Sequence, residues 1–139
     1  MPIMMDADAL AVFMKDVFKQ VADDFVIEHV AETDLTTRLV VDNRHLRPGG
    51  TVSGPSIFAL ADVSAYLMTL ARIGPKALAV TTNCSIDFMR KPAAGVDLIS
   101  KTRLLKLGKL LSVCDVLVYS EGLDSPVARA SLTYAIPPR

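Results

Sequence analysis

The stretch that decides the fold is RPGGTVSGPSIFALADVSAYLMTLA, residues 47–71. It opens with a turn rich in glycine and proline, and it continues as an apolar run, residues 57–71, in which Asp62 is the one group charged at neutral pH. The run predicts a helix of about residues 56–72 that ends at Gly74-Pro75. Since a buried acid without a partner costs several kcal/mol, we expect Asp62 to be either paired by distant residues or used for chemistry.

The segments on either side of this helix have patterns that indicate one more helix and several strands. Apolar residues recur with the helical period between Leu10 and Val21, and Asp6 or Asp8 lies near the start. Runs typical of strands, separated by short turns, indicate antiparallel neighbours. The predicted strands are residues 25–30 and 35–41 before the central helix, and residues 77–89, 96–106, 110–119 and 127–136 after it.

The order helix, two strands, long apolar helix and four strands predicts an α+β domain in which one antiparallel sheet wraps around the central helix. At 139 residues the chain fits a single domain, residues 1–139. Such a sheet leaves its outer face and its edges uncovered, and 51% of the residues are hydrophobic, which is high for a small monomer. We therefore expect a homo-oligomer, either a dimer or a dimer of dimers.

Composition and spacing argue against several classes of protein. Fifteen basic residues balance fifteen acidic ones, so bulk charge provides no attraction for nucleic acid. The central stretch contains Asp62, Ser64 and Thr69 and has no second apolar span to pair with the acid, so a membrane protein is not expected. Cys84 and Cys114 lie in apolar segments without the spacing of metal ligands, which indicates reduced core residues of a cytoplasmic protein. We predict no metal site and no resident cofactor.

Residues 47–62, RPGGTVSGPSIFALAD, resemble the signature of the PaaI-like hot-dog thioesterases, the phenylacetate-pathway and hydroxybenzoyl-CoA thioesterase-like enzymes. In that family an Asn-x-x-Gly-x-x-His-Gly-Gly turn leads into a central helix that carries an acid in Leu-x-Asp. Residues 81–95, TTNCSIDFMRKPAAG, resemble the next strand of the family, which ends in a Phe-x-Arg-Pro-type turn and a glycine. The resemblance spans residues 35–136, and it implies a hot-dog fold and hydrolysis of a small or medium acyl-CoA thioester.

The resemblance also implies roles for three residues. The backbone N–H of Gly54 would polarise the thioester carbonyl, since a helix N-terminus supplies free N–H groups and the positive end of the helix dipole. Asp62, about two turns further on, would act as general base or nucleophile, usually across a subunit interface. Thr81 matches the Ser/Thr position that holds the attacking water.

Three positions depart from the family pattern. Ser53 replaces the family histidine, and it is also a suitable N-cap for the helix. Pro55 replaces the second glycine and removes one possible N–H donor. Arg47 replaces the family asparagine, and it could either pair with Asp62 and hold the acid ionised or bind a phosphate or an acyl carboxylate.

Contacts to the rest of an acyl-CoA are predicted from residues in turns and from large apolar side chains. Long cations in turns suit the flexible phosphates of CoA, and the candidates are Arg90, Lys91, Lys106 and Lys109. Side chains that could line an acyl pocket, or simply belong to the core, are Phe58, Tyr66 and Met89.

The sequence leaves alternatives open. Asp62 could be a structural acid, while Gly54 and Thr81 could be an ordinary turn glycine and an ordinary strand threonine. The altered turn residues are compatible with a non-catalytic acyl-CoA-binding module on the same fold. A hot-dog dehydratase is a further class, because His45 followed by Pro48 loosely resembles the His-x-Pro-Gly turn of those enzymes. The separation of His45 from Asp62 is about three residues longer than in that pattern, which counts against the class.

Overall fold

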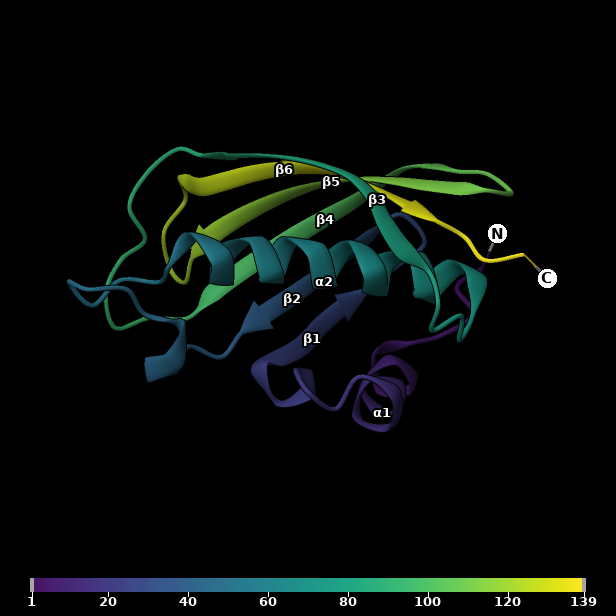
Figure 1. Ribbon diagram of the computed structural model, residues 1–139, viewed down its shortest axis with the longest axis horizontal. Coiled ribbons are helices and arrows are strands. Elements are labelled where there is room, and N and C mark those ends of the chain that lie inside the picture. The colour runs from purple at the N-terminus through teal and green to yellow at the C-terminus, as the bar shows by residue number, and fades with distance from the viewer. Residues whose placement is uncertain (1, 139) are drawn as a thin grey trace.

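The computed structural model describes residues 2–138 and contains one six-stranded antiparallel sheet that curves around a long helix (Figure 1). The strand order is β1-β2-β4-β5-β6-β3, so β1 and β3 form the two edges. The predicted α+β hot-dog architecture is therefore confirmed. The elements in chain order are α1 (Ala7–Val17), η1 (Ala22–Asp24), β1 (Phe25–Val30), β2 (Asp34–Leu39), η2 (Asn43–His45), α2 (Gly54–Ile73), β3 (Val80–Phe88), β4 (Leu98–Leu107), β5 (Leu111–Ser120) and β6 (Pro126–Ala135).

The central helix α2 begins and ends at residues that the sequence marks. Ser53 is the N-cap, and its Oγ accepts a hydrogen bond from the Ser56 N–H at 3.4 Å. Pro55 lies in the first turn, where its missing N–H breaks no helical hydrogen bond. At the other end Gly74 has a φ of 91° and donates its N–H to Leu70 O at 2.9 Å. The predicted helix of about residues 56–72 is confirmed.

Helix α2 lies in the hydrophobic core rather than on the surface. By length and composition it could cross a membrane, but two thirds of its most apolar window is buried inside the fold. Two hydroxyl pairs join it to the sheet: Ser100 Oγ donates to Ser64 Oγ at 2.6 Å, and the Oγ1 of Thr69 lies 2.8 Å from the Oγ of Ser112. The apolar run is thus the core helix of the domain.

The N-terminal helix α1 is shorter than the apolar stripe that predicts it. Leu10 and Met14 are buried, but the helix ends at Val17, and the N–H of Phe18 caps it on Met14 O at 2.9 Å. Val21 still packs against the core because a turn, closed by its N–H to Phe18 O at 3.1 Å, continues inward. The stripe therefore spans a helix and a turn.

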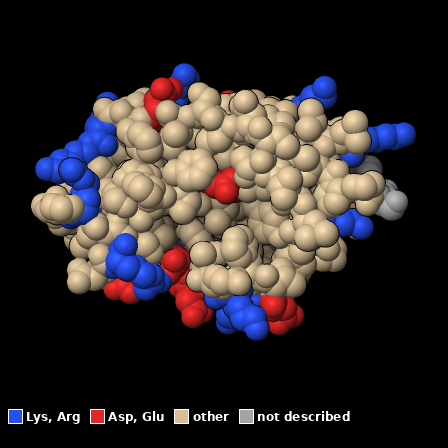
Figure 2. All heavy atoms as spheres, viewed as in Figure 1, with Lys and Arg blue, Asp and Glu red and all other residues tan. Residues whose placement is uncertain are grey.

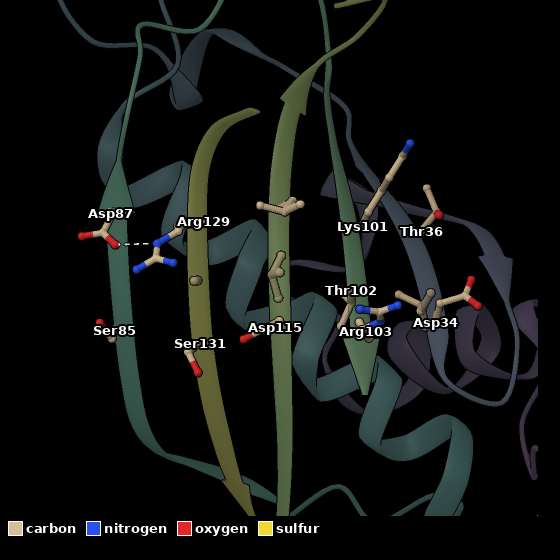
Figure 3. Close-up of a pocket in the computed structure, with 14 residues that line it drawn as sticks. Asp34, Thr36, Ser85, Asp87, Lys101, Thr102, Arg103, Asp115, Arg129 and Ser131 are labelled. Carbon is tan, nitrogen blue, oxygen red and sulfur yellow. Dashed lines mark hydrogen bonds and ion pairs between the residues drawn. The ribbon is translucent and has the colours of Figure 1, made fainter. Parts of the chain in front are cut away.

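The face of the sheet turned away from α2 is polar (Figure 3). Arg129 Nε donates to Asp87 Oδ2 at 2.9 Å, and Arg103 lies opposite Asp115 in the register of β4 and β5. A cavity of about 620 Å³ lies among these side chains. Because acids accompany the cations, this face presents no field of one sign.

Candidate active site

Asp62 is held by two hydroxyl groups from distant strands. Its Oδ1 accepts hydrogen bonds from Thr81 Oγ1 at 2.6 Å and from the Tyr134 phenol at 2.8 Å. Thr81 and Tyr134 are directly opposite each other in the register of β3 and β6, which brings the hydroxyls together under α2. The acid is therefore paired with residues that are distant in the sequence. Asp62 itself is only half-buried.

Tyr134 is a site residue that the sequence did not reveal. Burial, and then the nearby charge of Asp62, raises the pKa of the Tyr134 phenol well above its ordinary value. The phenol therefore stays protonated at neutral pH and remains a donor to the carboxylate. Its ring packs against Tyr66, with centroids 5.9 Å apart. The signal that would have found it is the register between the third and sixth strands, which alternation alone does not give.

The second carboxylate oxygen of Asp62 is available. Oδ2 has no hydrogen-bond partner among the described residues and is not buried. Beside Asp62 lies a cavity of about 430 Å³, whose lining is otherwise mostly apolar and comes from Val17, Phe18, Gln20, Val63, Tyr66, Ala77, Ala79, Val80, Thr81 and Tyr134. Figure 2 shows one acidic group near the middle of this face, over α2 and surrounded by uncharged atoms. A carboxylate oxygen beside an apolar cavity is suited to take a proton from a bound water.

Gly54 lines a different cavity, of about 490 Å³, where α2 begins. It is the first helical residue, and its N–H makes no backbone hydrogen bond among the described residues. The neighbouring hydroxyl of Ser53 is engaged locally, since it accepts from the Ser56 N–H and donates to Ser56 Oγ at 3.1 Å. Gly54 therefore offers a free donor at the positive end of a helix dipole, and Ser53 serves as the cap.

The Gly54 cavity is cationic. Arg47, Arg90 and Lys91 line it, and its lining contains no acid. Arg90 donates to Pro126 O, whereas the side chains of Arg47 and Lys91 have no ion partner among residues 2–138. Figure 2 shows basic side chains grouped at the end of the molecule where α2 begins. Unpaired cations beside a helix N-terminus attract anions, in contrast to the balanced outer face of the sheet.

The remaining predicted residues lie elsewhere. Lys106 is near the end of β4, and Lys109 lines a separate cavity with Ile73, at the C-terminal end of α2. Arg47 and Asp62 line different cavities of the chain, so the structure does not bring this pair together. The ring of His45 is buried and lines neither cavity, which leaves the dehydratase interpretation without support.

Within one chain the two halves of the predicted site are apart. At about 1.5 Å per residue, the eight residues from Gly54 to Asp62 span ~12 Å of helix. A reacting carbon must lie about 3 Å from both its activating groups. One chain therefore holds two half-sites rather than one complete site.

The described residues offer no obvious metal centre. Among residues 2–138 no group of three or more His, Cys, Asp or Glu side chains is arranged to hold a metal ion. The two cysteines are free, with Cys114 buried and Cys84 half-buried. The acid, the hydroxyls and the helix N-terminus are thus the groups that could act chemically.

Comparison with known proteins points to one family. The sequence profile of the thioesterase superfamily matches residues 49–127. The Pseudomonas aeruginosa protein PA0474, named as a candidate esterase, is 31% identical over 114 residues, which cover 81% of this chain and 83% of that protein. A solved structure of a candidate thioesterase from Silicibacter sp. TM1040 is 56% identical, with a TM-score of 0.92 over 98% of this chain and 94% of that one. A mutant of the phenylacetic acid degradation protein PaaI from Thermus thermophilus is 26% identical, with a TM-score of 0.71 over 91% of this chain and 99% of that one.

Proposed function

The chain belongs to the thioesterase superfamily and is a thioester hydrolase, and on this basis we propose that it hydrolyses a small or medium acyl-CoA at a site shared between two copies of the chain. The resemblance to PaaI-like hot-dog thioesterases is thereby confirmed. One observation carries the proposal: the two half-sites lie at opposite ends of the same exposed edge strand, β3. A cytoplasmic location stays a prediction.

Strand β3 links the two cavities. Val80 and Thr81 at its start line the Asp62 cavity, and Phe88 at its end lines the Gly54 cavity. Among residues 2–138 the strand pairs only with β6, so its other edge has N–H and C=O groups that no described strand pairs with. If two copies pair antiparallel about a two-fold axis at Cys84, the middle residue, Thr81 of one copy lies opposite Asp87 of the other. Each Asp62 half-site then approaches the Gly54 half-site of the second copy.

Exposed apolar side chains support this pairing. Val80, Phe88 and Met89 on and after β3, and Phe58 on α2, are all large and exposed in the single chain. Such a cluster on a soluble domain indicates a surface that another molecule covers. A dimer is sufficient to complete the site, and a dimer of dimers would add contacts that the chemistry does not need.

The proposed reaction uses two groups, the Asp62 carboxylate and the Gly54 N–H. Asp62 Oδ2 accepts a proton from water, and the water oxygen bonds to the thioester carbon while the carbonyl oxygen becomes negative. The Gly54 N–H of the second copy and the dipole of its α2 stabilise that charge. The C–S bond then breaks, and the proton passes from Asp62 to sulfur, so a carboxylic acid and the CoA thiol leave. Direct attack by Oδ2, with water cleaving the resulting anhydride, requires the same two groups.

Other residues are assigned to the attacking water, the acyl group and the CoA phosphates. Thr81 gives its one proton to Asp62, so its lone pairs are free to accept a hydrogen bond from the attacking water. The apolar cavity beside Asp62 suits the acyl group. Arg47, Arg90 and Lys91 suit the CoA phosphates, because they are cations without competing acids.

Mixing two inactive variants tests the shared site. Asp62→Asn and Gly54→Pro each damage one half-site, and we expect each alone to release thiol from a panel of acyl-CoAs at no more than about 1% of the wild-type rate. After subunit exchange, the mixture should recover about a quarter of the wild-type rate, because about half of the dimers are mixed and each holds one intact site. Each variant mixed with the Asp62→Asn/Gly54→Pro double variant is the control, and it should recover nothing.

Two outcomes would contradict the proposal. Mixed dimers seen by native mass spectrometry without recovered activity would show that the two residues act in the same chain or not at all. Affinity of the wild type for acyl-CoA without release of thiol would favour the non-catalytic binding module.

Replacing Tyr134 tests whether its phenol positions the Asp62 carboxylate. Tyr134→Phe keeps the ring against Tyr66 and removes the donor to Asp62 Oδ1. Since a hydrogen bond to a charged group contributes about 1.5–3 kcal/mol, we expect kcat to fall about tenfold or more with little change in KM. The control is Tyr119→Phe on β5, remote from both cavities. Equal kcat values in the two variants would show that the phenol does not position Asp62.

A further inference from the structure

His45 has no part in the reaction described above, yet its side chain is only 8% exposed. It closes the η2 turn, where its Nδ1 accepts a hydrogen bond from the Asp42 N–H at 2.8 Å. An Nδ1 that accepts a hydrogen bond carries no proton, so the neutral ring carries its proton on Nε2. Nε2 lies 3.4 Å from Oδ2 of Asp24, which is a residue of η1. The structure therefore requires one tautomer of a neutral histidine.

The backbone of the same residue holds the start of α2. His45 O accepts the N–H of Ser53, the N-cap, at 2.8 Å. The intervening loop is closed by the Arg47 N–H, which donates to Thr51 O at 2.9 Å. Gly54 follows Ser53 directly. The position of η2 is thus linked through one backbone hydrogen bond to the residue before Gly54, and through the loop to Arg47.

We propose that neutral His45 is a positioning residue whose Nδ1 bond to Asp42 fixes the η2 turn and, through Ser53, the Gly54 N–H at the thioester. Protonation of Nδ1 replaces the acceptor with a donor that faces another N–H, so the bond is lost and the turn is released. The inference rests on the proposed function only for the role of Gly54. The coupling of His45 to the start of α2 is a separate, structural statement.

Burial, and then the neighbouring Arg44, favour the neutral form of the His45 ring. Burial lowers the pKa of His45, the Arg44 guanidinium lowers it further, and Asp42 opposes them. Arg44 pairs with both Asp24 and Asp42, which weakens the attraction of these acids for an imidazolium. An unfolded histidine titrates near pH 6.5, so the unfolded chain binds a proton first as the pH falls. Neutral His45 therefore stabilises the turn fully above pH 6.5. This stabilisation is lost as the pH falls from 6.5 toward the pKa that His45 has in the folded chain.

Two variants separate the hydrogen bond from the bulk of the side chain. In His45→Asn the amide oxygen stands where Nδ1 stands and does not titrate, whereas His45→Gln moves its polar group toward the Nε2 position. We expect His45→Gln to lower kcat about tenfold through misplacement of the amide, and His45→Asn to recover most of that loss. On the acid side of the pH profile, kcat/KM of the wild type should fall partly because His45 takes up a proton. His45→Asn should not show this part of the fall. His29→Asn, an exposed histidine on β1, is the matched control.

Amide hydrogen exchange gives a readout that needs no activity. The N–H groups of Ser53, Ser56 and Ile57, which are hydrogen-bonded at the start of α2, should exchange several-fold faster in His45→Gln than in His45→Asn. In the wild type, after correction for the intrinsic pH dependence of exchange, they should exchange faster as the pH falls below 6.5. If Gln and Asn variants have equal kcat and equal exchange, the positioning role is wrong. If the exchange differs as expected in a chain that hydrolyses no acyl-CoA, the positioning role stands and the proposed function fails.

Discussion

Replacing Asp62 with asparagine is expected to lower kcat for acyl-CoA hydrolysis by about 10³-fold, because a positioned general base contributes ~10²–10⁴ in rate. The amide oxygen of asparagine can still accept the hydrogen bonds of Thr81 and Tyr134. The variant therefore keeps the support of residue 62 and loses the proton acceptor at Oδ2. A structural acid held by the same two hydroxyls would tolerate this change, so the experiment separates the two roles directly.

The measurement is thiol release at saturating substrate, together with acyl-CoA affinity and the free energy of unfolding. We expect affinity within a few-fold of wild type, since the CoA phosphates are assigned to the other cavity. Asp115→Asn, on the outer face of the sheet, is the matched control because it removes an exposed carboxylate far from α2. A kcat for Asp62→Asn near that of Asp115→Asn would show that the acid is structural.

Gly54→Pro is expected to lower kcat by about 10²–10³-fold, the usual effect of removing one oxyanion donor. Proline removes one N–H. The restriction that the following Pro55 places on a residue 54 with a side chain is shared by the alanine control described below. Gly54 is the first helical residue, where proline is well tolerated, and Ser53 already has the extended backbone (ψ 155°) that a following proline requires. Loss of activity without loss of the helix is therefore the expected result.

Gly54→Ala is the matched control because it keeps the N–H. An added Cβ would lie 3.6 Å from the Phe88 ring, an ordinary van der Waals contact, so we expect kcat within a few-fold of wild type. Circular dichroism and thermal unfolding check that both variants fold. Equal kcat values for the proline and alanine variants would show that this amide does not stabilise the oxyanion.

Local patterns predict most of the fold. The central helix is fixed by its cap at Ser53, its apolar length and its end at Gly74, and all three are local signals. The strands follow from alternation, although β3 begins at Val80, later than predicted, because residues 75–79 form a turn held by the Ala79 N–H on Lys76 O. The apolar stripe does not mark the end of α1, because Val21 keeps its place in the stripe after the helix has ended.

The site could be predicted only as far as local sequence reaches. Asp62 is recognisable from its position in the apolar run, but its partner Tyr134 depends on the register of strands 3 and 6, which a bulge after Thr81 shifts. The separation of Asp62 from Gly54 into two cavities depends on the geometry of α2. The assignment of Arg47 to the Gly54 cavity depends on the path of a loop with little regular structure.

The two hydroxyl pairs on α2 have a consequence for the angular orientation of this helix. A helix that is apolar on nearly every side gains similar burial at many rotations about its own axis, so hydrophobic packing alone selects none of them. Ser64 and Thr69 remove this degeneracy, because a rotated helix would take their hydroxyls away from the buried hydroxyls of Ser100 and Ser112, at about 1–3 kcal/mol for each partner lost. The bonds that Ser64 and Thr69 donate to Leu60 O and Ala65 O lie within the helix and do not depend on its rotation. The two hydroxyl pairs thereby determine on which side the helix presents its one carboxylate. Their contribution is to the uniqueness of the orientation more than to the free energy of unfolding.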